Sequence, residues 1–230
     1  MKAITISFCA LLAFNLVAQK PPIKFGNVPK EDLEMTTYLQ DSSAVAVVLA
    51  DFGESSIIFN QLNGFEIQFE RIRRVKILTK EGYDWANFSI PLYRQDNLDE
   101  KLTTLKAVTV NLENGKSSET KLGKDGIFEE IVSENWSQTK LTMPNVMVGS
   151  VIDITYKVTS PYLFNFQDWE FQTTIPVRWS EYQARIPEYY EYQRFLQGYV
   201  QLKINETSSQ SRTITITTKN REAGNFYANT

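Results

Sequence analysis

The chain has 230 residues, a formal net charge of −3, 42% hydrophobic residues and no histidine, a composition typical of a packed domain rather than a disordered one. Because Ser-His-Asp and Cys-His catalysis both need an imidazole to accept the proton of the nucleophile, neither mechanism is open to this chain by itself. The slightly acidic balance also lacks the clustered Lys and Arg side chains that nucleic-acid binding needs.

The first eighteen residues predict a signal peptide. Lys2 gives a positive start, residues 4–17 are almost wholly apolar, and Ala18 is the small residue that closes the run. This run is shorter than the ~20 residues of a membrane-spanning helix, and no later stretch approaches that length. We therefore expect residues 1–18 to be removed and residues 19–230 to be soluble, without a transmembrane segment, and periplasmic or secreted. An uncleaved anchor or a buried helix is the alternative.

The single cysteine, Cys9, lies inside this predicted signal peptide. After cleavage the chain has neither a thiol nor a disulfide, so it lacks the best nucleophile and the usual thiolate ligand of zinc. Cys9 is followed by further apolar residues, whereas a lipid-modified cysteine stands at the end of its signal, so we do not expect a lipoprotein. The remaining chain of about 210 residues is long enough to fold without disulfides.

The pattern along the rest of the chain is that of many short β-strands. A short helix is expected at 27–35, where a proline precedes acidic residues, and two more could fit at 80–87 and 187–197. Apolar and polar residues alternate with period two in several segments, which predicts strands with one buried face. The expected strands are residues 44–50, 57–59, 65–78, 102–112, 128–132, 140–143, 151–160, 169–174, 177–186, 200–205 and 212–218.

Turn residues such as Asn63-Gly64 separate these closely spaced strands. Since no long helix lies between them, we predict an all-β, mainly antiparallel fold: a β-sandwich with one or two short helices. Arg71 and Arg73 fall on the apolar face of the segment 65–78. A bulge near Ile72 or a rim position is the favoured explanation, because an unpaired buried charge costs ~3–5 kcal/mol; pairing of both cations inside is the alternative.

Three groups of polar residues weakly resemble catalytic or metal sites. Ser137 and Lys140 match the Ser-x-x-Lys pattern of serine acyl-transfer enzymes, but the companion Lys-Thr-Gly element is missing, so we expect a surface pair beside a strand. The acidic residues 96–100 lack the glycine and spacing of an EF-hand loop and are interpreted as a solvated loop. Two pairs of carboxylates are interpreted as solvated acids: Glu129 with Glu130, and Glu188 with Glu191. We predict no catalytic residue, no cofactor and no metal site.

Aromatic residues gather between positions 169 and 199 and form the best candidate for a binding surface. A large apolar ring with a polar tip is suited to stacking on a sugar or to contact with another domain. Simple burial, in the core or between domains, is the competing and favoured interpretation. The candidate residues are Trp169, Trp179, Tyr189, Tyr190, Tyr192, Phe195 and Tyr199.

Short motifs in a fixed order point to a known family. They are MPNVMVGSVIDITY at 143–156, DWEFQ at 168–172 and IPV at 175–177, with shorter ones at 113–116, 159–161, 179–182 and 186–189. With these motifs the chain resembles the domain of unknown function that precedes transglutaminase-like domains in exported bacterial proteins, over nearly all of residues 19–230. The resemblance implies a β-sandwich-type N-terminal module in the cell envelope, with no assigned catalytic residue.

The same resemblance implies that any Cys-His-Asp machinery belongs to a separate downstream domain. This sequence stops at Thr230 without one, inside what looks like an unfinished hairpin, so we expect a truncated chain. Two functions are then predicted: a non-catalytic scaffold that packs against a transglutaminase-like domain, or a glycan- or peptide-binding sandwich. Aromatic rings buried against a partner favour the first, and a coplanar exposed row of rings along a groove favours the second. A stand-alone enzyme, working through Lys, Tyr or carboxylate chemistry, is least favoured.

Overall fold

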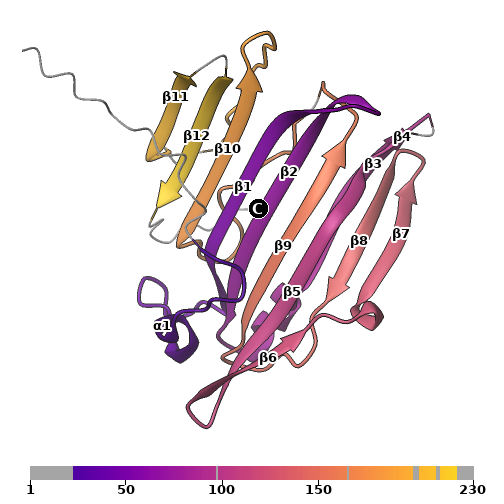
Figure 1. The fold of residues 1–230 in the computed structure, drawn as a ribbon. Helices are drawn as coiled ribbons and strands as arrows, with labels where there is room; N and C mark the ends of the chain where they lie inside the picture. Colours follow the sequence, from indigo (N-terminus) through magenta and orange to yellow (C-terminus); the bar gives the residue numbers. More distant parts are fainter. Residues whose placement is uncertain (1–22, 97, 165, 199–201, 211–212, 222–230) are drawn as a thin grey trace, which may run out of the picture.

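Two β-sheets form the fold in a computed structural model that describes residues 23–96, 98–164, 166–198, 202–210 and 213–221. The larger sheet has eight strands in the order β11-β12-β10-β1-β2-β9-β5-β6, and the smaller has four in the order β4-β3-β8-β7 (Figure 1). The predicted signal peptide at 1–18 and the candidate residue Tyr199 lie outside the described residues.

The elements follow one another along the chain with only short helices between the strands. They are α1 (Lys30–Glu34), β1 (Ala46–Asn60), β2 (Gly64–Ile77), the 3-10 helix η1 (Lys80–Ala86), β3 (Asn87–Gln95), β4 (Leu98–Asp99), β5 (Lys101–Glu113), β6 (Lys116–Lys121), the 3-10 helix η2 (Lys124–Gly126), β7 (Ile127–Ser133), β8 (Trp136–Thr142), β9 (Val151–Ser160), β10 (Trp179–Pro187), β11 (Ile204–Gln210) and β12 (Thr213–Arg221).

The predicted all-β, mainly antiparallel fold is confirmed: 57% of the residues lie in strands and 8% in helices. The exception among the described strand pairs is β1 with β10, which run parallel from Asp51 opposite Ser180 to Ser56 opposite Arg185. Parallel neighbours need a long crossover connection, and here the chain between β1 and β10 supplies half of the strands of the larger sheet and all of those of the smaller sheet.

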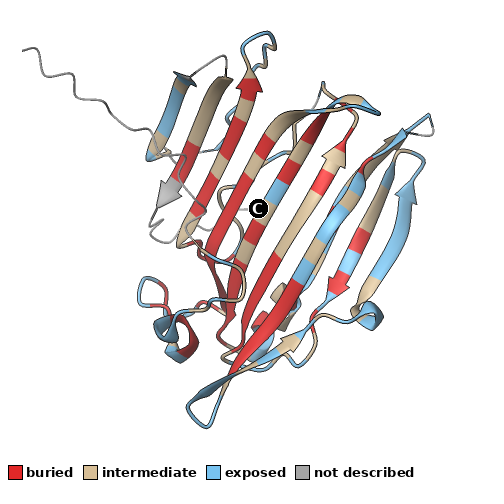
Figure 2. Cartoon of the chain, viewed as in Figure 1, coloured by how far each residue is buried: buried red, intermediate tan, exposed pale blue. Residues whose placement is uncertain are grey.

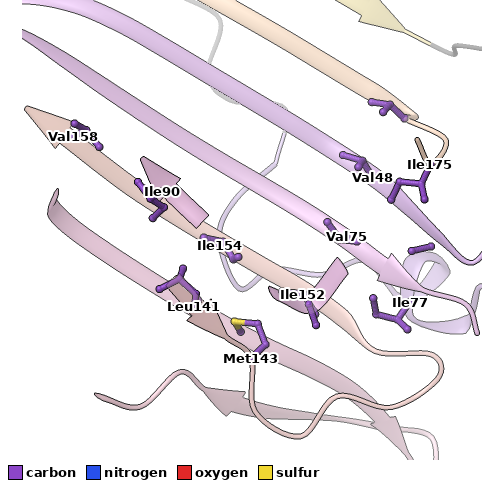
Figure 3. Close-up of a cluster of buried hydrophobic side chains, with 14 of the residues drawn as sticks. Val48, Val75, Ile77, Ile90, Leu141, Met143, Ile152, Ile154, Val158 and Ile175 are labelled. Atoms are coloured by element: carbon purple, nitrogen blue, oxygen red, sulfur yellow. The ribbon is translucent and has the colours of Figure 1, made fainter. Parts of the chain in front are cut away.

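Side chains on one face of the larger sheet form the core that joins the two sheets. Ile152 and Ile154 of β9 pack there with Ile90 of β3 and Leu141 of β8, and all four are buried (Figure 3). Because successive strand residues point to opposite faces, their sequence neighbours supply a second core: Val47 and Leu49 of β1, for example, face α1 (not the smaller sheet). The central strands β1, β2 and β9 are therefore buried along much of their length (Figure 2).

Several elements differ from the predicted ones. The segments predicted at 44–50 and 57–59 are parts of one long strand, β1, and the strand predicted at 200–205 begins later, as β11. Residues 169–174 form no strand; they cross the face of the larger sheet before Pro176 O accepts a hydrogen bond from Val48 N at 2.9 Å. The strand β6 was not predicted, because its polar sequence KSSETK becomes a strand only by pairing with β5.

The short helices are partly as predicted. The helix expected at 27–35 is present as α1, and the one that could fit at 80–87 is η1, whereas residues 187–197 form no helix. In the described residues no helix is both long and apolar enough to cross a membrane.

The expected bulge near Ile72, or a rim position for the two arginines, is wrong. The strand β2 pairs with β9 without interruption from Ile67 to Lys76, and the register shift lies in β1, between Val48 and Ala50. Arg71 and Arg73 therefore stay on the apolar face and point inward. The alternative is correct, because Asp51 on the neighbouring strand forms ion pairs with both arginines.

Candidate interaction surface

Six aromatic side chains meet at the end of the larger sheet where β1 turns into β2. We call this group the hairpin-end cluster. Among the ring pairs that touch, the centroids are 4.5 Å apart in the closest pair, Phe166 and Tyr192, and 6.4 Å apart in the most distant pair, Tyr190 and Tyr192. The members are Phe59, Phe65, Phe166, Tyr189, Tyr190 and Tyr192.

The turn between β1 and β2 holds the two phenylalanines of this cluster in place. The buried carboxylate of Glu66 accepts hydrogen bonds from the side-chain amides of Asn60 at 3.2 Å and Asn63 at 3.0 Å. Gly64 has a φ of +80°, a conformation that glycine adopts without steric cost. The turn predicted at Asn63-Gly64 is thus confirmed, and it places Phe59 and Phe65 opposite one another across the hairpin.

A second aromatic group lies at the same end, where β9 ends and β3 turns into β4. Tyr162 packs edge-to-face on Tyr93 at 4.9 Å, and its hydroxyl is near the carbonyl oxygens of Gln95 at 3.0 Å and Leu98 at 2.6 Å. The two groups are connected through the hydroxyl of Tyr192, which donates a hydrogen bond to Leu163 O. The group consists of Tyr93, Trp136, Tyr162 and Phe164.

Many of these rings remain exposed to solvent. Phe59 is 65% exposed, Tyr189 64% and Phe164 72%, which is unusual for large apolar side chains that share one end of a domain. Contiguous exposed aromatic residues mark interaction sites, since Tyr, Trp and Phe are enriched where proteins bind each other. This end of the molecule is therefore the candidate interaction surface.

The rings do not form a flat platform. Phe65 meets Tyr189 and Tyr190 at interplanar angles of 61° and 78°, and Phe59 at 64°. Edge-to-face packing gives the rings different orientations, whereas a row of sugars would need faces that lie in one plane. The grooves beside residues 23–27, beside α1 and beside β6 are lined by other residues, and none of these grooves contains a ring of the hairpin-end cluster.

The structure separates the aromatic residues predicted from sequence. Tyr189, Tyr190 and Tyr192 belong to the hairpin-end cluster, but Trp169 lies near the middle of the sheet, half-buried and stacked on Tyr182 at 5.4 Å. Trp179, at the start of β10, donates from Nε1 to Glu181 at 3.3 Å, away from the cluster. Phe195 is 82% exposed.

Sequence reasoning missed the phenylalanines of the β1–β2 hairpin. Phe65 continues the period-two alternation of the segment 65–78, a pattern that predicts a position on the buried face of the strand. Its position directly after Asn63-Gly64 was the available signal, since a residue beside a turn lies at the sheet end, where there is little core to cover it.

Tyr162 and Tyr192 of this region are neutral hydrogen-bond donors. Burial raises the pKa of Tyr192 and of Tyr162 above the ordinary value of 10.0. Burial also raises the pKa of Tyr182, which stacks on Trp169, to about 12, while its hydrogen bond with Ser55 acts in the opposite direction. Their contribution is therefore apolar contact with a polar tip rather than charge.

The weak catalytic motif formed by Ser137 and Lys140 is part of a strand. Ser137 and Lys140 both lie on β8, three residues apart and therefore on opposite faces, and Lys140 pairs with Glu130 at 2.5 Å. The carboxylates at 129, 130, 188 and 191 are all exposed. Nowhere in the described residues do three or more His, Cys, Asp or Glu side chains gather as metal ligands.

The acidic residues 96–100 are solvated as expected at Asp96, Leu98 and Asp99, but not at Glu100. Asp96 has a φ of +53° in a tight turn between β3 and β4, and Glu100 is only 8% exposed. Its carboxylate accepts a hydrogen bond from the backbone N–H of Tyr93 at 2.8 Å. Glu100 therefore fastens the start of β5 to β3.

Together, the two packed sheets and the aromatic end surface define a β-sandwich module with a candidate protein-binding surface. The chain belongs to the DUF3857 family, described as a domain of unknown function with solved structure, whose family model matches residues 66–223. This agrees with the family resemblance found in the sequence motifs. No curated protein matches the chain.

A solved structure shares the fold. A protein described as a putative protease from Parabacteroides distasonis superposes with a TM-score of 0.57 at 14% identity, covering 81% of this chain. An M1 zinc metallopeptidase from Deinococcus radiodurans gives a TM-score of 0.35 at 8% identity over 77% of this chain. The chain spans 36% of the length of the first structure and 39% of the length of the second.

Proposed function

We propose that this chain is a non-catalytic interaction module of an exported protein, and that its hairpin-end cluster packs against a transglutaminase-like domain of the same full-length protein. The observation that carries the proposal is the convergence of exposed aromatic rings from separate segments, β1, β2, 161–166 and 187–192, on one end of the sheet. Such residues anchor protein interfaces when a partner removes them from water.

Composition supports the non-catalytic part of the proposal. The whole sequence has no histidine, and its one cysteine lies in the predicted signal peptide. The usual proton acceptor and the strongest nucleophile are therefore missing from residues 19–230. The same predicted signal peptide supports export to the periplasm or the medium. The likeness to a part of a protein described as a putative protease supports a role beside an enzyme domain.

A glycan- or peptide-binding sandwich is the alternative. The structure favours the first function on one specific point, which is ring orientation. The interplanar angles of 61° and 78° around Phe65 present ring edges as well as faces, and a folded partner with pockets of its own fits such a surface better than a sugar chain does.

The proposal is tested with the gene itself. Sequencing beyond the codon for Thr230 is expected to reveal a transglutaminase-like domain, which is then expressed as a separate chain. Isothermal titration calorimetry measures its binding to residues 19–230. Phe59→Ala and Tyr189→Ala are each expected to weaken binding by about tenfold or more.

Phe128→Ala is the matched control, because Phe128 is 53% exposed but lies on β7, in the other sheet. It is expected to leave the affinity unchanged. A gene without such a domain, or binding that does not respond to loss of Phe59 or Tyr189, contradicts the proposal. Binding of peptidoglycan fragments that is lost in both variants would support the alternative.

A further inference from the structure

Arg71 and Arg73 are neighbours on the inward face of β2, and both face the carboxylate of Asp51. Arg71 holds this carboxylate with two parallel hydrogen bonds, from Nε to Oδ1 at 2.8 Å and from Nη2 to Oδ2 at 2.6 Å. This is the bidentate geometry in which a guanidinium group recognises a carboxylate. Asp51 is 3% exposed, so the pair lies inside the protein.

In Arg73 the corresponding atoms, Nε and Nη2, have no hydrogen-bond acceptor among the described residues. Nε of Arg73 lies 3.5 Å from Oδ2 of Asp51, an oxygen that Arg71 already binds. Within the part of the chain that the structure describes, neither Nε nor Nη2 of Arg73 has a hydrogen-bond acceptor, although both atoms are buried. Buried donors are nearly always hydrogen-bonded, and leaving one unmade costs about 1–3 kcal/mol.

A third buried donor lies on the segment that crosses this face. In the described residues Nε2 of Gln172 also has no acceptor. At one end of this segment, Trp169 packs on Gly53 of β1, and at the other end Pro176 O accepts a hydrogen bond from Val48 N of the same strand. Because Asp51 lies between Val48 and Gly53 on β1, the segment passes beside it. Gln172 stands between those two points of the chain.

Aromatic rings surround the two guanidinium groups. The Trp85 and Phe88 rings lie 5.9 Å from Cζ of Arg73, and the Trp169 ring lies 4.6 Å from Cζ of Arg71. Other parts of these side chains reach the surface, since 21% of the Arg71 side chain and 15% of the Arg73 side chain are exposed, whereas Nε and Nη2 of Arg73 are themselves covered. A ligand would therefore approach the buried edge from the side where the two arginines reach the surface.

Positive charge exceeds negative charge around Arg73, and this excess favours the binding of an anion. Two guanidinium groups share one buried carboxylate, that of Asp51. Glu170, which attracts Arg73 from the crossing segment, is exposed. Burial lowers the pKa of Arg73 from its ordinary value, which reflects the loss of water around its charge.

We propose that the Nε–Nη2 edge of Arg73 binds a carboxylate group of a ligand, in the same bidentate way that Arg71 binds Asp51. Gln172 supplies a further donor, and the rings of Trp85 and Phe88 keep water away from the contact. The ligand class is a molecule with a free carboxylate, such as a peptide end. The site lies between the sheets, away from the hairpin-end cluster, and does not rest on the proposed function.

Nuclear magnetic resonance of the Arg73 side chain tests the proposal directly. Residues 19–230 are labelled with 15N, and the Nε–H resonance of Arg73 is followed while N-acetylalanine is added at constant ionic strength. N-acetylalaninamide, which has the same size and no carboxylate, is the matched ligand control. A saturable shift with the acid and none with the amide is the expected result.

Variants assign the shift to the site. Arg73→Lys removes the planar fork while keeping the charge, and is expected to weaken binding of N-acetylalanine by about tenfold or more. Arg94→Lys, at an exposed arginine of β3, is expected to leave binding unchanged. If Arg73→Lys does not fold, the matched ligands still decide the question with the unaltered chain.

Three results would overturn the proposal. The first is an equal response to the acid and the amide, and the second is an affinity that Arg73→Lys does not change. The third is a loss of N-acetylalanine binding in Arg94→Lys equal to that in Arg73→Lys, since this would show that the acid does not bind at Arg73 in particular.

Discussion

Arg74 of β2 and Asp153 of β9 form an ion pair that is almost completely buried. Nε and Nη2 of Arg74 lie 2.6 and 2.8 Å from the two carboxylate oxygens, and the side chains are 1% and 0% exposed. Asp153 also accepts a hydrogen bond from Gly26 N–H at 2.9 Å, and Arg74 donates to the carbonyl of Asn27 at 3.0 Å. The pair thus fastens residues 23–27 to the outer face of the larger sheet.

Loss of either charge of this pair is expected to destabilise the fold strongly. Asp153→Ala leaves the Arg74 guanidinium buried without its carboxylate, so the free energy of unfolding should fall by about 3–5 kcal/mol. Asp99→Ala breaks the exposed pair with Arg94 and should cost about 1 kcal/mol or less. Urea unfolding measures both variants, and similar losses would refute the role of burial.

Lys76 is expected to make stability depend on pH. It is buried, and Nζ donates to the carbonyls of Leu33 at 2.8 Å and Gly149 at 2.6 Å. Burial lowers its pKa from 10.5 to about 8, although the carboxylate of Asp32 opposes this shift. Between these two values the unfolded chain binds more protons than the folded one, so this group makes the free energy of unfolding rise with pH.

Urea unfolding of Lys76→Met at several pH values between about 8 and 10.5 measures this contribution. The rise with pH is expected to be smaller in this variant than in the unaltered chain, whatever its overall stability. Lys30→Met, which removes a lysine that is 73% exposed, should keep the original slope. An unchanged slope in Lys76→Met would show that Lys76 does not titrate in this range.

Tyr182 is expected to act in the opposite direction at higher pH. Burial raises its pKa from 10.0 to about 12, so between these values the folded state holds a proton that the unfolded state releases. This group therefore makes the free energy of unfolding decrease as the pH rises through that range. In Tyr182→Phe the decrease should be smaller, whereas Tyr189→Phe, at a residue 64% exposed, should behave like the unaltered chain.

Gly53 allows Trp169 to pack flat on β1. A Cβ atom at position 53 would lie 2.8 Å from Cε3 and Cη2 of the Trp169 ring. Gly53→Ala is therefore expected to lower the free energy of unfolding by about 1–3 kcal/mol and to change the tryptophan fluorescence, because the ring must move. Gly115→Ala serves as a comparison that measures backbone strain without a packing clash: Gly115 has a φ of +77°, and no atom lies within 4 Å of its added Cβ, so the tryptophan fluorescence should stay unchanged. Unaltered stability and fluorescence in Gly53→Ala would contradict this packing.

Export predicts a defined N-terminus. The apolar run closes at Ala18, and Pro21 and Pro22 prevent a helix from continuing, so the exported product should begin at Gln19. Mass spectrometry of the protein isolated from the cell envelope measures this directly. An intact segment 1–17 on that protein would show that the signal peptide is retained.

The sequence by itself determined the features that depend on neighbouring residues. The alternation of apolar and polar side chains in β2 and β9 predicts strands because the pleat of a strand sends successive residues to opposite faces. The turn at Asn63-Gly64 and the short helix α1 are local in the same sense. The motifs between 143 and 189 indicated the family for a related reason, since their order along the chain carries the signal.

Only the tertiary structure decided which distant segments meet. The parallel pairing of β1 with β10 joins residues more than a hundred positions apart, and no local pattern encodes it. The inward placement of Arg71 and Arg73 depends on Asp51 of another strand, which compensates a burial cost that the sequence pattern alone made unfavourable. Phe59 and Tyr189 share one surface for the same physical reason: side chains from remote segments come together only when strand register fixes where each strand ends.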